Sequence, residues 1–235
     1  TTKLNNLAEC TACLFVSLNS CNIENKLFVL CPIKSTSHRH TCSFVIMEVR
    51  LRAPFTLGII APSQGGKSVF AFRLIDHADV MITPPPKKII YCYGEYQEIF
   101  DNFKHVTFHQ GLPDLSEFVG NTEPILMILD DLMSEWNEEI AKLFTKYSHH
   151  RNISVVYMSQ NLFSKNKHAR VISLNTHYLV LMKNSRDVTQ IATLARQMFP
   201  KNARYMLESY RDAVKPDYGY LLIDLKPTTD DRIRL

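Results

Sequence analysis

Glycine, tryptophan and long apolar runs are all scarce in this sequence. Its 235 residues include seven glycines and one tryptophan. No apolar run approaches the roughly 18 residues that a membrane-spanning helix needs, so we expect no membrane partner. The net charge of +4 is small for this length, and it neither demands nor excludes a nucleic-acid partner. With 46% hydrophobic residues, the chain is long enough for one large globular domain.

Cysteine is almost absent after residue 42. Five of the six cysteines lie in the first 42 residues, and the sixth is Cys92. Cys10 and Cys13 have the two-residue spacing of a zinc knuckle, and His38, His40 and Cys42 are further candidate ligands. The second half of such a site lacks the regular paired spacing of zinc motifs, so we expect no zinc site.

Residues 1–46 are expected to be an atypical cysteine-containing N-terminal extension. The sequence opens on threonine, and its early apolar residues lack the basic region that begins a secretory signal. We interpret the segment as an upstream extension outside the native fold, with Met47 as the true start. Residues 47–235 are then predicted to form one domain.

Strand-like and helix-like patterns alternate through residues 47–235. Six short runs rich in β-branched and apolar residues are typical of buried strands, at residues 55–61, 87–94, 125–131, 153–160, 177–184 and 219–225. Helical patterns lie between them, at residues 67–78, 137–150, 186–199 and 203–214. This alternation predicts an α/β fold with a mainly parallel sheet and helices on both faces.

The segment APSQGGKS follows the first of these strands and opens the first helix. It fits the phosphate-loop (Walker A) pattern with alanine in the first place. Glycines let the backbone direct several N–H groups at phosphate oxygens, and the helix start adds a positive dipole end. The lysine reaches the β- and γ-phosphates and the serine ligates Mg²⁺. The predicted ATP-binding residues are Ala61, Pro62, Ser63, Gln64, Gly65, Gly66, Lys67 and Ser68.

Acidic residues end two of the predicted strands. Asp130 ends the run EPILMILD, where a carboxylate would hold Mg²⁺ together with Ser68. Asp131 is the first candidate for the base that polarises the attacking water, and Glu95 is the competing candidate because it should lie at the same sheet edge. The choice between Asp131 and Glu95 stays open.

Chain order indicates one class of P-loop protein. A strand-like run separates the phosphate loop from the Asp130 strand, and the strand after Asp130 ends in the polar residue Gln160. This looks like the additional-strand class of P-loop ATPases, in which a polar sensor at that strand tip contacts the γ-phosphate.

Several motifs also resemble one superfamily. RNISVVYMSQN, with Arg151 before the strand and Gln160 at its tip, is similar to the arginine-strand-glutamine segment of FtsK–HerA DNA-pumping ATPases. A closer resemblance is to the genome-packaging ATPases of Polinton/Maverick elements and adintoviruses. It is carried by the ordered set APSQGGKSVF, YCYGEYQ, GLPDL, ILDDLM, FTKYSHHRNISVVYMSQNLF, ISLNTHYLVLMKNSRD and YGYLLIDLKP. Two residues depart from these patterns: Ala61 stands where many relatives have Gly, and Asp131 stands where many FtsK–HerA motors have Glu.

The resemblance implies a homo-oligomeric ring, a hexamer or pentamer, that hydrolyses ATP with Mg²⁺ and pushes double-stranded DNA into a capsid. Capsid vertex or portal proteins are the implied partners, and the implied location is intracellular, at the host nucleus or virus assembly site, or with the virion. A helicase-like or DNA-partitioning ATPase is the second reading, a P-loop kinase the third. An inactive genomic relic is also retained as a reading.

Two sets of basic residues complete the predicted site. Arg151 matches the arginine that completes a neighbouring subunit's site, and we expect it near the nucleotide edge of the sheet; Arg186 is the alternative. Lys165, Lys167 and Arg170 are the candidate DNA contacts, in an expected loop after the sensor strand.

Overall fold

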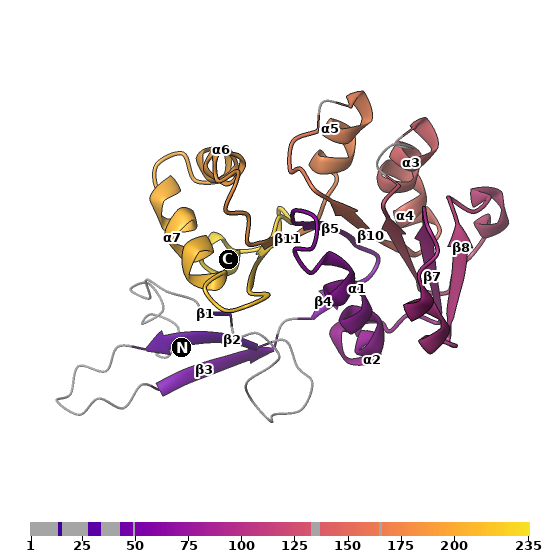
Figure 1. The fold of residues 1–235 in the computed structure, drawn as a ribbon, viewed down its shortest axis with the longest axis horizontal. Helices are drawn as coiled ribbons and strands as arrows, with labels where there is room; N and C mark the ends of the chain where they lie inside the picture. The colour runs from indigo at the N-terminus through magenta and orange to yellow at the C-terminus, as the bar shows by residue number, and fades with distance from the viewer. Residues whose placement is uncertain (1–13, 16–27, 34–42, 49, 133–136, 165) are drawn as a thin grey trace.

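A computed structural model describes residues 14–15, 28–33, 43–48, 50–132, 137–164 and 166–235 (Figure 1). Its centre is a seven-stranded sheet in which only the last strand runs antiparallel to its neighbour. The spatial order is β12 (Tyr220–Asp224), β11 (Tyr178–Met182), β5 (Thr56–Ile60), β10 (Ile153–Ser159), β9 (Ile125–Asp130), β7 (Lys88–Tyr93) and β8 (Val106–Gln110).

Strand β10 lies between β5, which leads into the phosphate loop, and β9, which ends at Asp130. In this register Ser159 of β10 pairs with Ile60 of β5, and Tyr157 pairs with Leu129 of β9. Because all three strands are parallel, their carboxyl ends meet at one edge of the sheet. The predicted additional-strand order is therefore confirmed, and it brings the ends of β5, β10 and β9 together.

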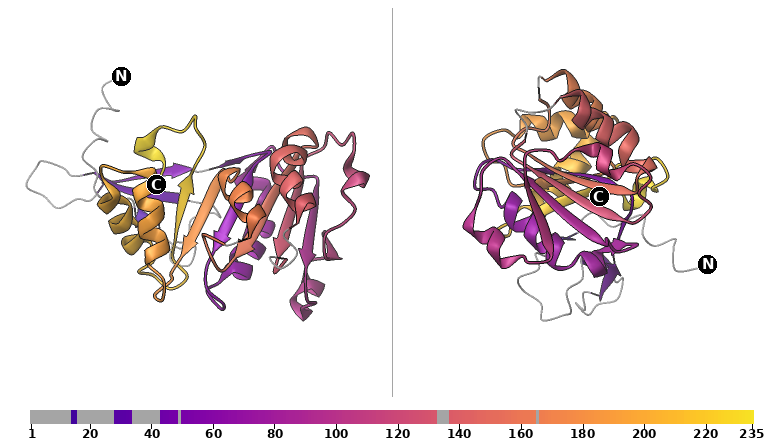
Figure 2. Two further views of the ribbon diagram at one scale, coloured as in Figure 1. Left: turned by 90° about the horizontal axis from the view of Figure 1, so that it is seen from above. Right: turned by 90° about the vertical axis from the view of Figure 1, so that its right-hand side faces the viewer.

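Helices cover both faces of the sheet, as predicted (Figures 1 and 2). The helix after the phosphate loop, α1 (Lys67–Asp76), and the short α2 (Ala78–Met81) lie on one face. The other face carries α3 (Glu138–Lys142), the π-helical turn η5 (Leu143–Tyr147), α4 (Ser148–His150) and α5 (Lys167–Leu174). Helices α6 (Thr189–Met198) and α7 (Ala203–Ala213) pack together, and α7 contacts β12. Single 3₁₀ turns are η2 (Glu98–Asn102), η3 (Leu115–Phe118) and η6 (Asp231–Ile233).

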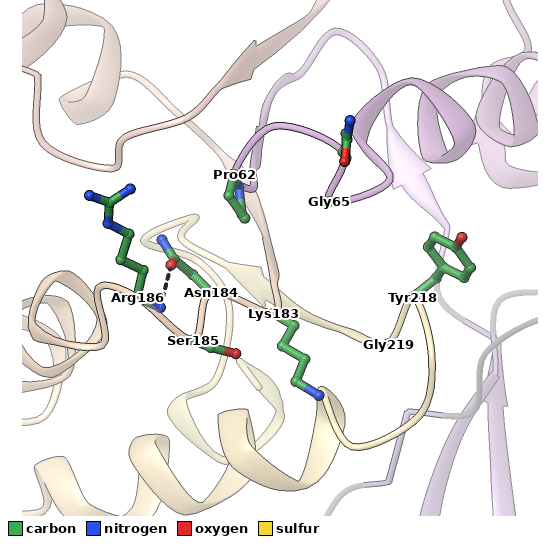
Figure 3. Close-up of a pocket in the computed structure, with 9 residues that line it drawn as sticks. Pro62, Gly65, Lys183, Asn184, Ser185, Arg186, Tyr218 and Gly219 are labelled. Carbon is green, nitrogen blue, oxygen red and sulfur yellow. Dashed lines mark hydrogen bonds between the residues drawn. The ribbon is translucent and has the colours of Figure 1, made fainter.

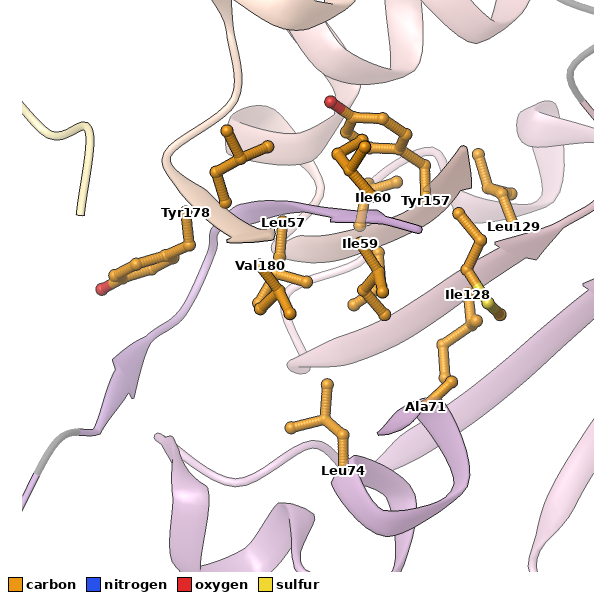
Figure 4. Packing of buried hydrophobic residues seen from close by; sticks show 14 of the residues in the cluster. Leu57, Ile59, Ile60, Ala71, Leu74, Ile128, Leu129, Tyr157, Tyr178 and Val180 are labelled. Carbon is orange, nitrogen blue, oxygen red and sulfur yellow. The ribbon is translucent and has the colours of Figure 1, made fainter. Parts of the chain in front are cut away.

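The core lies on both faces of the central strands, and one part of it packs between the sheet and α1. Every residue of β5, β9, β10 and β11 is buried, which explains why these strands are continuous apolar runs. Leu57, Ile59 and Val180 extend from the sheet toward Ala71 and Leu74 of α1 (Figure 4). Burying each large side chain contributes about 1.5 to 3 kcal/mol, so this packing fixes where α1 begins relative to the sheet.

Two elements correct the sequence analysis. Edge strand β8 was not expected, because only its first residue is buried and the run HVTFHQ is short. Residues 164–170 were expected to form a loop, but residues 167–174 form helix α5. The Asn166 side chain accepts a hydrogen bond from the backbone N–H of His168 at 2.8 Å and so caps this helix.

The first part of the chain contributes a separate three-stranded antiparallel sheet. Its strands are β1 (Leu14–Phe15), β2 (Phe28–Ile33) and β3 (Ser43–Glu48). Met47 pairs with Val29, so the expected boundary at residue 46 falls inside β3. The division into an extension and a domain stays a prediction. All five candidate zinc ligands lie outside the described residues.

Two short strands form a parallel pair outside the main sheet. One is β4 (Leu51–Arg52), which precedes β5 in the chain, and the other is β6 (Ile82–Thr83), which follows α2.

Within the described parts of the chain, none of the helices combines the length and apolar character needed to cross a membrane.

Candidate nucleotide-binding site

The phosphate loop connects β5 to α1 through two glycines that no other residue type fits well. Gly66 has φ of +93°, in the left-handed region that favours glycine. A Cβ built on Gly65 would lie 2.9 Å from both the Ala61 Cβ and the Pro62 carbonyl oxygen. The Gly65 N–H donates to the same Pro62 oxygen at 3.0 Å, which closes the turn. The tight loop therefore requires the adjacent glycines.

Lys67 is the first residue of α1, and its side chain folds back over the loop. The Nζ atom donates to the carbonyl oxygens of Ala61 and Pro62, each at 3.0 Å. Partial burial lowers the pKa of Lys67, while the nearby carboxylates of Asp130 and Asp131 raise it. The ammonium thus lies among loop carbonyls and beside the acidic residues that end β9.

Asp130 ends β9 and is a buried acid with one defined partner. It is 8% exposed, and its Oδ2 accepts a hydrogen bond from the Tyr91 hydroxyl at 2.7 Å. Burial raises the pKa of Asp130 and the neighbouring Asp131 adds to this rise, whereas the Tyr91 hydrogen bond and Lys67 act in the opposite direction.

Sequence reasoning missed Tyr91. It lies on β7, is fully buried, and its own pKa is raised by burial and by Asp130. The signal was a hydroxyl within the four buried residues of β7, because a buried hydroxyl needs a hydrogen-bond partner.

Both candidate bases lie at the predicted edge. Asp131 follows β9, is exposed, and has a φ of +57°. Tyr93 pairs with Asp130, which brings the residues after β7 beside it. Gly94 lies beside Asp131, since a Cβ built on Gly94 would be 3.5 Å from the Asp131 carbonyl oxygen. The exposed Glu95 is the next residue in the chain. The choice of Asp131 or Glu95 as base stays a prediction.

Gln160 lies where the motif order placed it, beside the start of the phosphate loop. The carbonyl of Ser159, the residue before it, accepts a hydrogen bond from the Ala61 N–H at 3.1 Å. The Ser159 hydroxyl donates to the Asn161 carbonyl at 2.6 Å, which fixes the turn that presents the exposed Gln160. Its role as a γ-phosphate sensor stays a prediction.

Arg151 is not at the nucleotide edge, and that expectation is wrong. It precedes β10, and the amino ends of parallel strands lie at the edge opposite the phosphate loop. The seven residues of β10, at about 3.3 Å each, separate the two edges by roughly 20 Å. The guanidinium lies 3.7 Å from the Tyr147 ring centroid and donates to the Leu115 carbonyl. Arg151 therefore has no contact with the phosphate loop of its own chain.

Arg186, the alternative arginine, lies beside its own phosphate loop. It follows β11 and lines a pocket of about 380 Å³ with residues 183–185, the loop residues Pro62, Gln64 and Gly65, and the turn before β12 (Figure 3).

The candidate DNA contacts are not among the residues that line this pocket. Lys167 and Arg170 are exposed on α5, three residues apart on one helix, and Lys165 lies outside the described residues. Contact with DNA stays a prediction for all three.

Two solved structures are similar to this chain. The genome packaging NTPase B204 of Sulfolobus turreted icosahedral virus 2, solved with ATP-gammaS, is 11% identical with a TM-score of 0.48, over 75% of this chain and 95% of that chain. The cytoplasmic domain of the type VII secretion ATPase EccC of Thermomonospora curvata is 14% identical with a TM-score of 0.50, over 86% of this chain and 28% of that chain. No family model and no curated protein matches the sequence. The chain has the predicted P-loop NTPase fold.

Proposed function

We propose that this protein is a Mg²⁺-dependent ATPase. One observation carries the proposal: a single sheet edge holds the phosphate loop with Lys67, the buried carboxylate of Asp130 and the exposed Gln160. Lys67 would bind the β- and γ-phosphates, and Gln160 would contact the γ-phosphate. Either Asp131 or Glu95 would accept a proton from the attacking water.

The residues present fit ATP and Mg²⁺. The loop backbone makes a turn that a Cβ at Gly65 would obstruct, as a phosphate cradle requires. Ser68 and Asp130 offer oxygen ligands, the type that Mg²⁺ prefers. Among the described residues no three His, Cys, Asp or Glu side chains form a metal cluster, which suits a cation held by two protein groups, waters and phosphates. When bound, Mg²⁺ would neutralise charge on the transferred phosphoryl group.

We further propose that the chain is a genome-packaging motor that moves double-stranded DNA into a capsid as a pentameric or hexameric ring. The support is the ordered set of motifs that resembles Polinton and adintovirus packaging ATPases, including Arg151 and Gln160. Capsid vertex or portal proteins would be its partners, at the host nucleus or virus assembly site. The name of EccC specifies secretion, so the shared fold alone does not select DNA as cargo.

ATP hydrolysis by the full chain, with and without double-stranded DNA, tests these proposals, together with its mass in solution. We expect Mg²⁺-dependent turnover that DNA stimulates, from an oligomer. Turnover without DNA stimulation would contradict the motor but not the ATPase. Phosphate transfer to a small acceptor instead of water would favour the kinase reading. A motor that unwinds duplexes or works without a capsid vertex would favour the helicase-like reading.

A further inference from the structure

The pocket that Arg186 lines is formed by three segments far apart in the sequence. The phosphate loop forms one wall, residues 183–186 after β11 form a second, and Tyr218 with Gly219 before β12 forms the third (Figure 3). Its volume of about 380 Å³ is within the range of small-ligand sites, which is roughly 300 to 1,000 Å³. The motif analysis assigned no role to Tyr218.

The position of this pocket relative to Asp130 defines which part of a nucleotide it could receive. Asp130 and Gln160 follow β9 and β10, which lie on one side of β5 in the sheet. The terminal phosphate belongs on that side, because the metal ligand and the sensor act on it. A nucleotide bound across the loop then extends its nucleoside toward the other side of β5, where β11 and the pocket lie.

Tyr218 offers a flat apolar surface at that end. It is 60% exposed, and its φ of +58° is a conformation that non-glycine residues rarely adopt. Its ring lies against the phosphate loop, since a Cβ built on Gly66 would be 3.0 Å from the Tyr218 Cδ1. An exposed aromatic ring beside a phosphate loop suits stacking by a nucleic base, because every base has a π face.

The wall opposite Tyr218 is held by hydrogen bonds within the chain. The Asn184 Oδ1 accepts from the backbone N–H groups of Arg186 and Asp187, both at 3.1 Å. The Tyr210 hydroxyl donates to the Met182 carbonyl at 2.9 Å and accepts from the Asn184 N–H at 3.0 Å. The pocket therefore has a preformed wall, which lowers the ordering cost of binding.

Two exposed cations line the same pocket. Lys183 and Arg186 lie on the segment after β11, and their side chains extend from it in different directions (Figure 3). Their charges suit a ligand whose apolar ring is joined to phosphates, and they favour a nucleotide over an uncharged nucleoside.

We propose that this pocket binds the base and ribose of the nucleotide, with the Tyr218 ring stacking on the base and Lys183 and Arg186 near the α-phosphate. The inference rests on the proposed ATPase function and extends it to the nucleoside end of the site. It makes Tyr218 a binding residue whose contribution is separate from that of the phosphate loop.

Binding of two ligands to the full chain with Mg²⁺ separates the nucleoside end of the site from the phosphate end. The ligands are ATP and inorganic tripolyphosphate, which has no nucleoside. Tyr218→Ala should weaken ATP binding about ten- to a hundred-fold and leave tripolyphosphate binding unchanged. Tyr218→Phe should bind both as the parent does, because it keeps the ring. Leu174→Ala, an exposed residue at the end of α5, is the surface control and should change neither.

Equal loss of both ligands in Tyr218→Ala would overturn the inference, because the ring would then support only the loop. Parent-like ATP binding by Tyr218→Ala would overturn it as well. If the parent binds neither ligand, the ATPase proposal itself fails. Loss of ATP binding in Tyr218→Ala, with tripolyphosphate binding kept as in the parent, would support the inference.

A measurement on the parent protein avoids any folding defect of the variants. Nitration of exposed tyrosines, mapped by mass spectrometry, should show that ATP protects Tyr218 and that tripolyphosphate protects it much less. Tyr96, which is 56% exposed outside the pocket, is the matched control and should be nitrated equally in all samples. Nitration of Tyr218 at the same rate with saturating ATP would overturn the inference.

Discussion

At the residue scale, the site depends on a buried carboxylate whose charge has few partners. Asp130 is nearly buried, so its ionised form loses hydration that contacts within the protein must replace. The Tyr91 hydroxyl supplies one hydrogen bond, and the nearby Lys67 ammonium supplies an opposite charge. Tyr91 is thus a positioning residue, since it occupies one carboxylate oxygen of the predicted Mg²⁺ ligand.

Replacing Lys67 with alanine should abolish most ATP turnover and leave the fold intact. Its Nζ donates to two loop carbonyls and lies near two carboxylates, so its removal costs little apolar packing. We expect a fall in the rate of at least about a hundred-fold, as for the loss of a group that stabilises transition-state charge. Steady-state ATPase assays and thermal unfolding measure the two effects. Hydrolysis at the parent rate would show that this segment is not a phosphate loop.

Tyr91→Phe should raise the Mg²⁺ concentration needed for half-maximal hydrolysis and lower the free energy of unfolding by about 1 to 3 kcal/mol, because Asp130 loses its donor. Tyr157→Phe is the matched control. It removes another buried tyrosine hydroxyl, which lies 3.2 Å from the Thr176 Oγ1. The control should lose stability without a change in the Mg²⁺ requirement. The same Mg²⁺ titration curve for Tyr91→Phe and parent would contradict the positioning role.

The positions of Lys67 and Asp130 at one sheet edge could be predicted from the sequence, but the contacts of Tyr91 and Tyr218 could not. The first two belong to motifs in which neighbours along the chain supply the chemistry. Tyr91 reaches Asp130 only through the register of β7 against β9, and Tyr218 reaches the phosphate loop only because β12 folds back antiparallel on β11. Contacts between elements distant in sequence depend on a register that apolar runs do not specify.

At the scale of elements, the buried parallel strands were the most predictable part. Each lies within a run of β-branched and apolar residues, because both faces of the sheet are covered. Strand β8 and helix α5 were missed, since one is a partly exposed edge and the other begins at an asparagine cap within a basic segment. Arg151 was assigned to the wrong edge, because it precedes its strand whereas the nucleotide residues follow theirs.

The turn between α7 and β12 places Tyr218 against the phosphate loop, and Gly219 is its critical residue. The Gly219 N–H donates to the Pro216 carbonyl at 3.0 Å. A Cβ on Gly219 would lie 2.4 Å from the Ala213 carbonyl oxygen, which is backbone and has little freedom to move. The turn therefore cannot keep this geometry with a larger residue.

Gly219→Ala should destabilise the protein by about 1 to 3 kcal/mol, as overpacking against fixed atoms does. Denaturant unfolding measures the change. Gly94→Ala is the control, since its Cβ would lie 3.5 Å from the nearest atom, at ordinary contact distance. That variant should stay within about 0.5 kcal/mol of the parent. Equal stability of Gly219→Ala and parent would show that the turn relaxes freely.

At the scale of the whole molecule, the predicted catalytic residues of one chain lie at opposite edges of its central sheet. Lys67 and Asp130 lie at the carboxyl edge of the sheet, and Arg151 lies at the amino edge, roughly 20 Å away by strand length. An arginine in that position could act on ATP only if a second copy brought its nucleotide edge to it. The geometry thus makes the predicted finger role dependent on assembly.

Arg151→Ala should therefore bind ATP as the parent does but hydrolyse it far more slowly, by about 10³ to 10⁵ if the residue acts as an arginine finger. A Lys67→Ala subunit has a defective pocket and an intact arginine, and an Arg151→Ala subunit has the reverse. Mixed assemblies should regain part of the activity that neither variant shows alone, and this recovery should increase with protein concentration because it requires association. ATPase assays of each variant and of the mixture, with subunit exchange monitored by mass, measure it. If subunits exchange and the mixture stays inactive, or if Arg151→Ala keeps the parent rate, the trans role is refuted and Arg186, beside the phosphate loop of its own chain, becomes the arginine to test.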